Sequence, residues 1–320
     1  MTSEITLFVN PTAGRGRGAA AARPAARVLR EAGFRVRTVV GTDAEDAARR
    51  AKEAVAAGTA ALVAVGGDGL LSLALGAVAG TRTPLGVIAV GSGNDFGRSL
   101  GLPVRAPAEA AAVIARALRE DTRRPIDLGR VAGRWYGTVL ATGFDSRVND
   151  RGNRMRLPLG RFRYDLAILA ELAAFKPTAY RLRLDDGPVR EIEATLIAVG
   201  NSTSYGGGMR ICADARLDDG LLDVTVVGPC GRGTLLKVFP RVYRGTHLSH
   251  RVVTSYRAGR VELDAVGLTG YADGEPLGPL PLTATAHPAA VRLLAAPVKE
   301  KRRPNPEPLW KSPRPEAGGV

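Results

Sequence analysis

The feature that most constrains the fold is a regular alternation of short apolar runs and alanine-rich stretches over the first 130 residues. The runs at 5–9, 35–40, 60–65 and 86–90 predict strands, and the stretches at 19–31, 44–57, 70–79 and 106–119 predict helices. This alternation is typical of a parallel sheet covered by helices on both faces. Such sheets bind ligands outside the carboxyl ends of their strands, so the loops after Val9, Val65 and Val90 are the first candidates for a site.

After residue 127 the pattern changes to short apolar runs separated by Gly, Pro and Asp, which predicts an antiparallel β domain. Only the segment 151–176 departs from it, with a basic start followed by a helical apolar pattern. The sequence therefore predicts an α/β domain over 1–128, a β domain over 129–297 and a disordered tail rich in Pro and Arg over 298–320. The predicted strands of the second domain are 135–142, 180–184, 192–199, 222–227, 252–256 and 261–263.

Composition narrows the class of partner. The net charge is +14, from 45 Lys and Arg against 31 Asp and Glu, which fits an anionic partner or a GC-rich genome equally well. Aromatic residues make up only 5%, too few for base-stacking platforms, so we do not expect nucleic acid. The two cysteines fit a reducing cytosol. Because no apolar run is long enough to cross a bilayer, we expect any membrane contact to be peripheral.

Glycine-rich loops follow three of the predicted parallel strands. The first runs from Asn10 to Gly18 and, taken alone, could be an ordinary strand-to-helix turn. The second is Gly66-Gly-Asp-Gly69, and the third is Gly91-Ser-Gly-Asn-Asp-Phe-Gly-Arg98. Glycines let the backbone approach phosphates closely, and the N–H groups of the following helices attract anions. The three loops together predict a nucleotide-phosphate site, with Asp68 organising its loop or a metal.

The sequence resembles the diacylglycerol kinase catalytic domain family, which includes bacterial soluble lipid kinases, sphingosine kinases and ceramide kinases. The resemblance spans about residues 4–295. Besides the three loops it rests on Thr142-Gly-Phe-Asp145, Gly200-Asn-Ser-Thr-Ser-Tyr-Gly-Gly-Gly208, Asp218-Asp-Gly-Leu-Leu-Asp-Val224 and Asp273-Gly-Glu275.

The resemblance implies a Rossmann-like nucleotide domain, a C-terminal β-sandwich that receives the lipid, and an active-site cleft between the two. It also implies transfer of the γ-phosphoryl group of ATP to a lipid hydroxyl with Mg²⁺, diacylglycerol being the expected acceptor. By motif matching, the ATP-binding residues would be Asn10, Pro11, Thr12, Ala13, Gly14, Thr42, Gly66, Gly67, Asp68, Gly69, Ser92, Asn94 and Asp95. Of these, Thr42 has a second interpretation, as a helix N-cap.

Two acidic segments carry the remaining expected roles. Phosphoryl transfer needs a carboxylate near the attacking hydroxyl, so we assign Glu275 as proton acceptor and Asp273 as metal ligand or alternative base. Without the resemblance, the same segment would be an ordinary acidic hairpin turn. The resemblance also implies a structural Mg²⁺ bound by the Asp219 side chain and the backbone oxygens of Arg216 and Leu221, against a simple β-turn as the alternative.

One departure from the family pattern bears on activity. The family usually has Thr or Ser directly after Gly-Gly-Asp-Gly, whereas this chain has Leu70. The missing hydroxyl could cost one phosphate hydrogen bond, or mark a regulatory protein with weakened catalysis. A kinase of another lipid, such as a sphingoid base, or of a soluble acceptor, as in NAD kinases, is a further alternative.

Five arginines between 151 and 163, followed by an amphipathic pattern, could rest on anionic lipid or flank a core helix. We expect a cytoplasmic protein that visits the inner membrane surface. Its expected partners are a lipid substrate and that anionic surface, with a homodimer left open.

Overall fold

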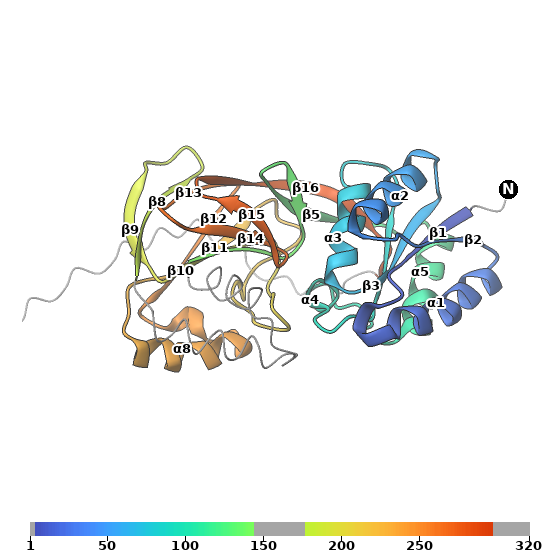
Figure 1. Cartoon of the computed structure of the whole chain (residues 1–320), viewed down its shortest axis with the longest axis horizontal. Helices are drawn as coiled ribbons and strands as arrows, with labels where there is room; N and C mark the ends of the chain where they lie inside the picture. Colours follow the sequence, from blue (N-terminus) through green and yellow to red (C-terminus); the bar gives the residue numbers. More distant parts are fainter. Residues whose placement is uncertain (1–3, 144–176, 297–320) are drawn as a thin grey trace, which may run out of the picture.

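The computed structural model describes residues 4–143 and 177–296, which form two lobes joined side by side (Figure 1). The first lobe contains β1 (Glu4–Val9), α1 (Ala13–Glu31), β2 (Arg35–Val39), α2 (Ala44–Ala56), β3 (Ala61–Gly66), α3 (Asp68–Val78), β4 (Leu85–Ala89), α4 (Asp95–Ser99) and α5 (Pro107–Arg119). The rest of the chain forms β5 (Arg124–Val131), β6 (Arg134–Tyr136), β7 (Val139–Gly143), β8 (Thr178–Leu184), β9 (Arg190–Ala194), β10 (Leu196–Gly200), β11 (Leu222–Val227), α8 (Arg232–Arg244), η1 (His247–Ser249), β12 (Val253–Ala258), β13 (Arg260–Asp264), β14 (Thr269–Ala272), β15 (Glu275–Pro279) and β16 (Leu282–Leu293).

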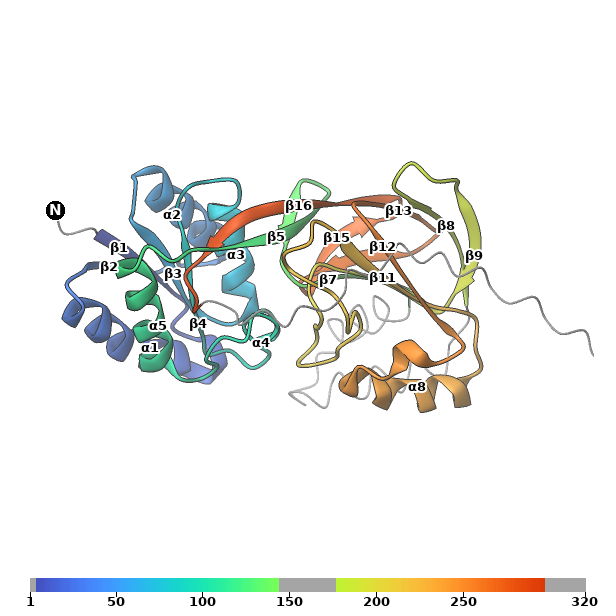
Figure 2. The same cartoon turned by 180° about the vertical axis from the view of Figure 1, so that it is seen from behind.

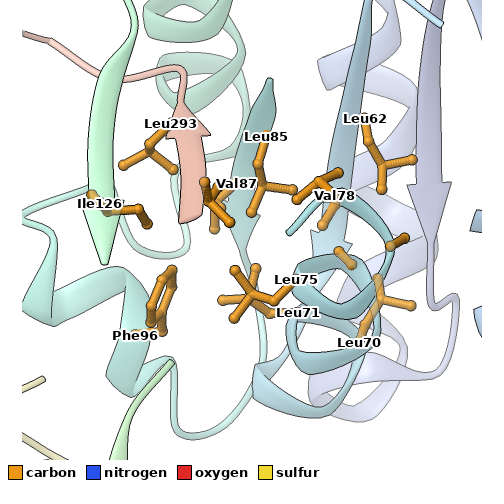
Figure 3. Close-up of a cluster of buried hydrophobic side chains, with 14 of the residues drawn as sticks. Leu62, Leu70, Leu71, Leu75, Val78, Leu85, Val87, Phe96, Ile126 and Leu293 are labelled. Carbon is orange, nitrogen blue, oxygen red and sulfur yellow. The ribbon is translucent and has the colours of Figure 1, made fainter. Parts of the chain in front are cut away.

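The first lobe is a parallel sheet in the order β2-β1-β3-β4 between two helical layers (Figure 1). Successive side chains along each strand point to opposite faces of the sheet. Leu7 and Val63 pack with α1 and α5, whereas Phe8 and Leu62 pack with α2 and α3. Figure 3 shows the α3 side of this core, where Leu71 and Leu75 of α3 lie below Val87 of β4 and Leu293 of β16 lies beyond it. Covering both faces explains why these strands read as continuous apolar runs.

The second lobe packs two antiparallel sheets face to face. One has the order β12-β11-β10-β7-β14-β15, and the other contains β13, β8 and β9 with part of β16 and β5. Their inner faces share one core, and α8 covers the outer face of the six-stranded sheet through Leu235, Val238 and Val242. The predicted fold class, a parallel α/β domain followed by an antiparallel β-sandwich, is confirmed.

The long strand β16 connects the two lobes (Figure 2). Its first part pairs with β13, its middle with β5, and Leu293 pairs in parallel with Leu85 of β4. The nucleotide-lobe sheet and one sheet of the sandwich are therefore a single ten-stranded sheet. The predicted boundary at 128/129 falls inside β5, and the end of β16 returns to the core of the first lobe.

One helix departs from the predicted pattern, since α8 lies in the region expected to be β structure. Pro240 inside this helix, and Gly233 near its start, are residues typical of turns, which hid the helical period. The predicted amphipathic segment 151–176 and the tail 298–320 lie outside the described residues. Within 4–143 and 177–296, no helix is long and apolar enough to cross a membrane.

Candidate active site

The first glycine loop folds against its neighbour at the carboxyl edge of the parallel sheet. The Asn10 side-chain oxygen accepts hydrogen bonds from the backbone N–H of Thr12, at 3.1 Å, and from its hydroxyl, at 2.8 Å. Gly14, Arg15 and Gly16 then follow with positive φ angles of 60°, 65° and 88°. A Cβ atom at Gly14 would lie 2.2 Å from the carbonyl oxygen of Val90, so only glycine permits this approach.

Arg17 fastens this loop to the one after β4. Its Nε donates to the Val90 carbonyl at 3.1 Å, and its terminal nitrogen donates to the Gly91 carbonyl at 3.0 Å. The sequence analysis missed this residue. The signal that could have found it was an arginine set among the glycines of the first loop.

The second and third loops touch through their glycines. A Cβ atom on Gly91 would lie 2.5 Å from the Cα of Gly67. Asp68 accepts a hydrogen bond from the Asn94 backbone N–H at 2.7 Å, and the Asn94 side chain donates to the Gly91 carbonyl at 2.9 Å. Asn94 adopts the left-handed conformation, with φ 61°, which asparagine tolerates better than most residues. The carboxylate of Asp68 therefore organises the loop, as predicted from the motif.

Three oxygens at this junction are buried without a hydrogen-bond partner among the described residues: Oδ1 of Asp68, Oδ1 of Asn94 and Oδ1 of Asp95. All three are acceptors. The Arg98 guanidinium lies 3.6 Å from Oδ1 of Asp95, so the oxygens that fit a further donor or a hard cation such as Mg²⁺ are those of Asp68 and Asn94. No three His, Cys, Asp or Glu side chains within 4–143 and 177–296 form a metal site by themselves. A magnesium ion here would take its remaining ligands from phosphate oxygens and water, which is how this ion usually binds with nucleotides.

Asp95 connects the two lobes. Its other oxygen accepts a hydrogen bond from the Gly207 backbone N–H at 2.7 Å, and Gly207 belongs to the glycine-rich loop of the second lobe. Burial raises the pKa of this carboxyl, and the nearby charge of Asp68 raises it further. One turn later, the Ser99 hydroxyl lies 3.3 Å from the hydroxyls of Ser202 and Ser204. The second lobe therefore contacts the nucleotide lobe at Asp95 and Ser99, next to the carboxyl edge of the sheet.

Asp273 lies in the two-residue turn of the β14–β15 hairpin, where it and Gly274 have φ angles of 51° and 83°. Such Asp-Gly turns are common in hairpins. Its carboxylate accepts hydrogen bonds from the backbone N–H groups of Gly137, at 3.0 Å, and Thr138, at 2.8 Å, and from the Thr138 hydroxyl at 2.6 Å. Burial raises the pKa of Asp273, these hydrogen bonds oppose the shift, and the charge of Asp68 adds to it.

Gly137 brings this carboxylate to the nucleotide lobe. A Cβ atom there would lie 2.6 Å from the Phe96 ring and 2.8 Å from Leu75, which belong to α4 and α3. Asp273 is thus held on the wall of the second lobe that faces the glycine loops. No sequence pattern predicts the roles of Thr138 and Gly137, because the approach depends on how the lobes pack.

Other predicted residues are exposed. Glu275 is exposed at the start of β15, so the geometry favours the alternative assignment of Asp273 as base. Ser92 is exposed in its loop, and Gly69 is exposed in the first turn of α3. Thr42 is exposed after β2 and its N–H donates to Asp46 at 3.0 Å, but the N-cap of α2 is Asp43. Its alternative interpretation as an N-cap is therefore wrong.

Leu70 is buried beneath the second glycine loop. It is 6% exposed and packs into the core between α3 and its neighbours (Figure 3). Gly66 lies against it, since a Cβ atom there would be 2.7 Å from Leu70. A hydroxyl at this position would be directed into the core.

The predicted structural metal site contains a cation supplied by the chain itself. The Asp219 carboxylate pairs with the guanidinium of Arg257 and accepts the Leu221 backbone N–H at 3.1 Å. Arg257 also lies 3.7 Å from Asp223. As arranged, the side chain of Asp219 does not fit a metal ion with the backbone oxygens of Arg216 and Leu221, because Arg257 occupies the cation's place. The metal role of these three residues stays a prediction.

Comparison with known proteins matches two families along the chain. Residues 4–131 match the diacylglycerol kinase catalytic domain, and residues 138–295 match the YegS C-terminal NAD kinase beta sandwich-like domain. A protein of Mycobacterium tuberculosis named diacylglycerol kinase is 44% identical over 91% of this chain and 94% of its own length. A protein of Pseudomonas aeruginosa named probable lipid kinase YegS-like is 34% identical over 85% of this chain and 88% of its own.

Solved structures show the same fold. A diacylglycerol kinase from Bacillus anthracis superposes with a TM-score of 0.70 at 23% identity, covering 92% of this chain and 97% of that one. An NAD kinase from Archaeoglobus fulgidus in complex with ATP superposes with a TM-score of 0.51 at 12% identity, covering 92% of each chain. At these identities the likeness concerns the fold alone.

Proposed function

Because the chain belongs to the diacylglycerol kinase family of lipid kinases, we propose that it transfers the γ-phosphoryl group of ATP to diacylglycerol, forming phosphatidic acid. The observation that carries this proposal is the junction of three glycine loops, at the carboxyl edge of the parallel sheet, facing one positioned carboxylate. The loops offer backbone N–H groups to phosphates, and the carboxylate can accept a proton. The named relatives support a lipid kinase, and diacylglycerol is the acceptor that we propose.

The glycine loops would hold the nucleotide phosphates. Gly14, Gly67 and Gly91 let the loops pack backbone against backbone where they meet, and α3 begins at Asp68. Arg17 and Asn94 keep the loops in register through bonds to the carbonyls of Val90 and Gly91. Asp68 and Asn94 would hold a Mg²⁺ ion through their unpartnered side-chain oxygens, and that ion would supply positive charge to offset the phosphates.

Asp273 would accept the proton of the attacking hydroxyl. The hydroxyl oxygen bonds to the γ-phosphorus, the bond from that phosphorus to the β,γ-bridging oxygen breaks, and ADP leaves. The proton moves to the Asp273 carboxylate, whose raised pKa makes it a better acceptor than an ordinary aspartate. Gly137 and Thr138 orient the carboxylate, which reduces the freedom lost on reaching the transition state.

The test is a product analysis with purified protein, Mg·ATP and a panel of hydroxyl acceptors. The panel contains diacylglycerol, a sphingoid base, ceramide and NAD, and mass spectrometry identifies the phosphorylated product. Phosphatidic acid as the main product supports the proposal, whereas phosphorylated NAD would favour a soluble acceptor. If ATP binds normally and no lipid is phosphorylated, the proposal fails.

Two matched variants test the assignment of the base. We expect Asp273→Asn to lower kcat by about 10²–10⁴-fold with little change in the Kd for ATP. Glu275→Gln, a change of the same size two residues later, should cost about tenfold or less. The reverse order would restore the original assignment of Glu275 as proton acceptor.

A further inference from the structure

Helix α8 exposes large apolar side chains to solvent on its outer face. Leu235, Val238 and Val242 are buried against the six-stranded sheet, at spacings of three and four residues. The same spacing brings Leu236, Phe239 and Tyr243 together on an adjacent face. Leu236 is 55% exposed and Tyr243 48% exposed, and the Phe239 and Tyr243 rings meet edge to face with centroids 5.9 Å apart. The three form an apolar ridge, the α8 ridge, in contact with water.

Positive charge flanks the α8 ridge. Lys237, Arg241 and Arg244 are exposed beside it, and Arg232 lies in the first turn. From Val224 to Val261 the sequence contains no Asp or Glu. No carboxylate among the described residues lies within ion-pair distance of Lys237, Arg241 or Arg244. An exposed apolar ridge bordered by cations is the pattern of a helix that lies in the plane of an anionic membrane.

The position of α8 suits a membrane-facing role. Figures 1 and 2 both show α8 along the lower edge of the second lobe, on the side toward which α4 and the start of α1 also lie. The C-terminal part of α8 is tied to the glycine-rich loop at the active site, because Arg210 donates to the Val242 carbonyl at 3.1 Å. The same loop reaches Asp95 through Gly207. A surface that holds α8 would therefore lie next to the junction of the lobes.

We propose that the α8 ridge and its flanking cations dock the protein on an anionic lipid bilayer. The occupant is a bilayer surface, because the ridge offers aliphatic and aromatic side chains beside cations, which matches the interfacial layer of acyl chains and anionic headgroups. This inference rests on the proposed function in that a lipid kinase must reach a substrate embedded in a membrane. Its test, however, needs no catalysis.

The test is flotation of the full-length protein with vesicles, without ATP or substrate. Vesicles contain either phosphatidylcholine alone or phosphatidylcholine with phosphatidylglycerol. We expect wild-type protein to bind the anionic vesicles at least tenfold more strongly. Leu236→Ser/Tyr243→Ser and Lys237→Glu/Arg241→Glu should each lose at least tenfold of that binding, while circular dichroism and thermal melting stay close to wild type.

The matched control is Lys52→Glu/Arg37→Glu, which reverses one lysine and one arginine exposed on the nucleotide lobe. It should bind within about twofold of wild type. If it loses as much as the α8 charge reversal, or if either α8 variant binds like wild type, the inference is overturned. Loss of binding to a single-stranded oligonucleotide, with vesicle binding unchanged, would also overturn it by indicating a nucleic-acid surface.

Activity on short-chain diacylglycerol dispersed without vesicles separates this inference from the proposed function. The α8 variants should retain wild-type kcat/KM on this acceptor. If the protein phosphorylates a lipid but the α8 variants bind vesicles like wild type, only the proposed docking surface is disproved. If α8 is needed for vesicle binding but no lipid is phosphorylated, only the proposed reaction is disproved.

Discussion

At the scale of single residues, the hydrogen bonds of Asp273 set both its position and its proton affinity. Burial and the charge of Asp68 raise its pKa, while the Thr138 hydroxyl and two backbone N–H groups stabilise the anion. A base must be ionised to act, so kcat/KM should fall as the pH falls through the pKa of Asp273. The acidic limb of the pH profile should therefore lie above the ordinary range of an aspartate.

Thr138→Val tests this arrangement without removing the carboxylate. The change deletes the 2.6 Å hydrogen bond from the Thr138 hydroxyl, which favours the ionised form. We expect the acidic limb of kcat/KM to move to higher pH, with the plateau reduced by about tenfold or less. Thr142→Val is the matched control, because its hydroxyl donates to the Ile197 carbonyl instead. A limb that stays in place in Thr138→Val would contradict the role of Asp273 as base.

Leu70 departs from the family pattern, and the question at this position is whether the departure lowers activity. Its side chain is buried in the α3 core (Figure 3), so Leu70→Thr would place a hydroxyl among apolar side chains. We expect about 2–4 kcal/mol less free energy of unfolding, measured with denaturant, and kcat/KM within twofold of wild type. Leu73→Thr, one turn along at a half-buried position, should cost less. A large gain in rate for Leu70→Thr would show that the natural site is weakened.

At the scale of elements, the acidic loop before β11 is held by β12. Arg257 reaches from β12 to Asp219 in the loop and lies near Asp223, and burial lowers the pKa of this arginine. The family resemblance implied a Mg²⁺ site at this acidic segment, with a simple β-turn as the alternative. The counter-charge comes from a residue 38 positions away in the chain, and only the pairing of β11 with β12 places it there.

Arg257→Met should reveal whether the guanidinium replaces a metal. The change keeps the aliphatic stem and removes the charge, which leaves two partly buried carboxylates without a cation. We expect a loss of about 2–3 kcal/mol in stability, partly restored by millimolar Mg²⁺, while the Tm of the wild type is the same in Mg²⁺ and in EDTA. Arg260→Met, at an exposed pair with Glu262, should show neither effect. A wild-type Tm that drops on chelation would place a metal beside Arg257.

At the scale of the whole molecule, the sequence predicted the strand–helix order of the nucleotide lobe because period and loop chemistry are local. Strands β1 to β4 lie within about one residue of the predicted runs. The site was predictable as far as its glycine loops and Asp68. Arg17, Thr138 and the approach of Gly137 to Phe96 depend on contacts between distant segments, so no local pattern encodes them. The same holds for β16, whose end, at residue 293, completes a lobe that begins 289 residues earlier, at residue 4.

That long-range strand makes the nucleotide lobe dependent on the end of the chain. Val291, Leu293 and Leu294 of the 290–295 segment are at most 1% exposed and lie in the cores on both faces of the nucleotide-lobe sheet. Burying each such side chain contributes about 1.5–3 kcal/mol, and a domain of this size has a net stability of only about 5–15 kcal/mol. A nucleotide lobe cut after Val131 would lack all three and would expose the edge of β4.

We therefore expect the fragment 1–131 to be unfolded or aggregated, and the full chain to unfold in one transition. The matched control joins residues 289–296 to that fragment through a flexible glycine-serine linker, which returns the end of β16 to its place beside β4. This control should regain cooperative melting by circular dichroism, and calorimetry of the full chain should give equal calorimetric and van't Hoff enthalpies. Cooperative melting of 1–131 at the Tm of the full chain would show instead that the nucleotide lobe folds without β16.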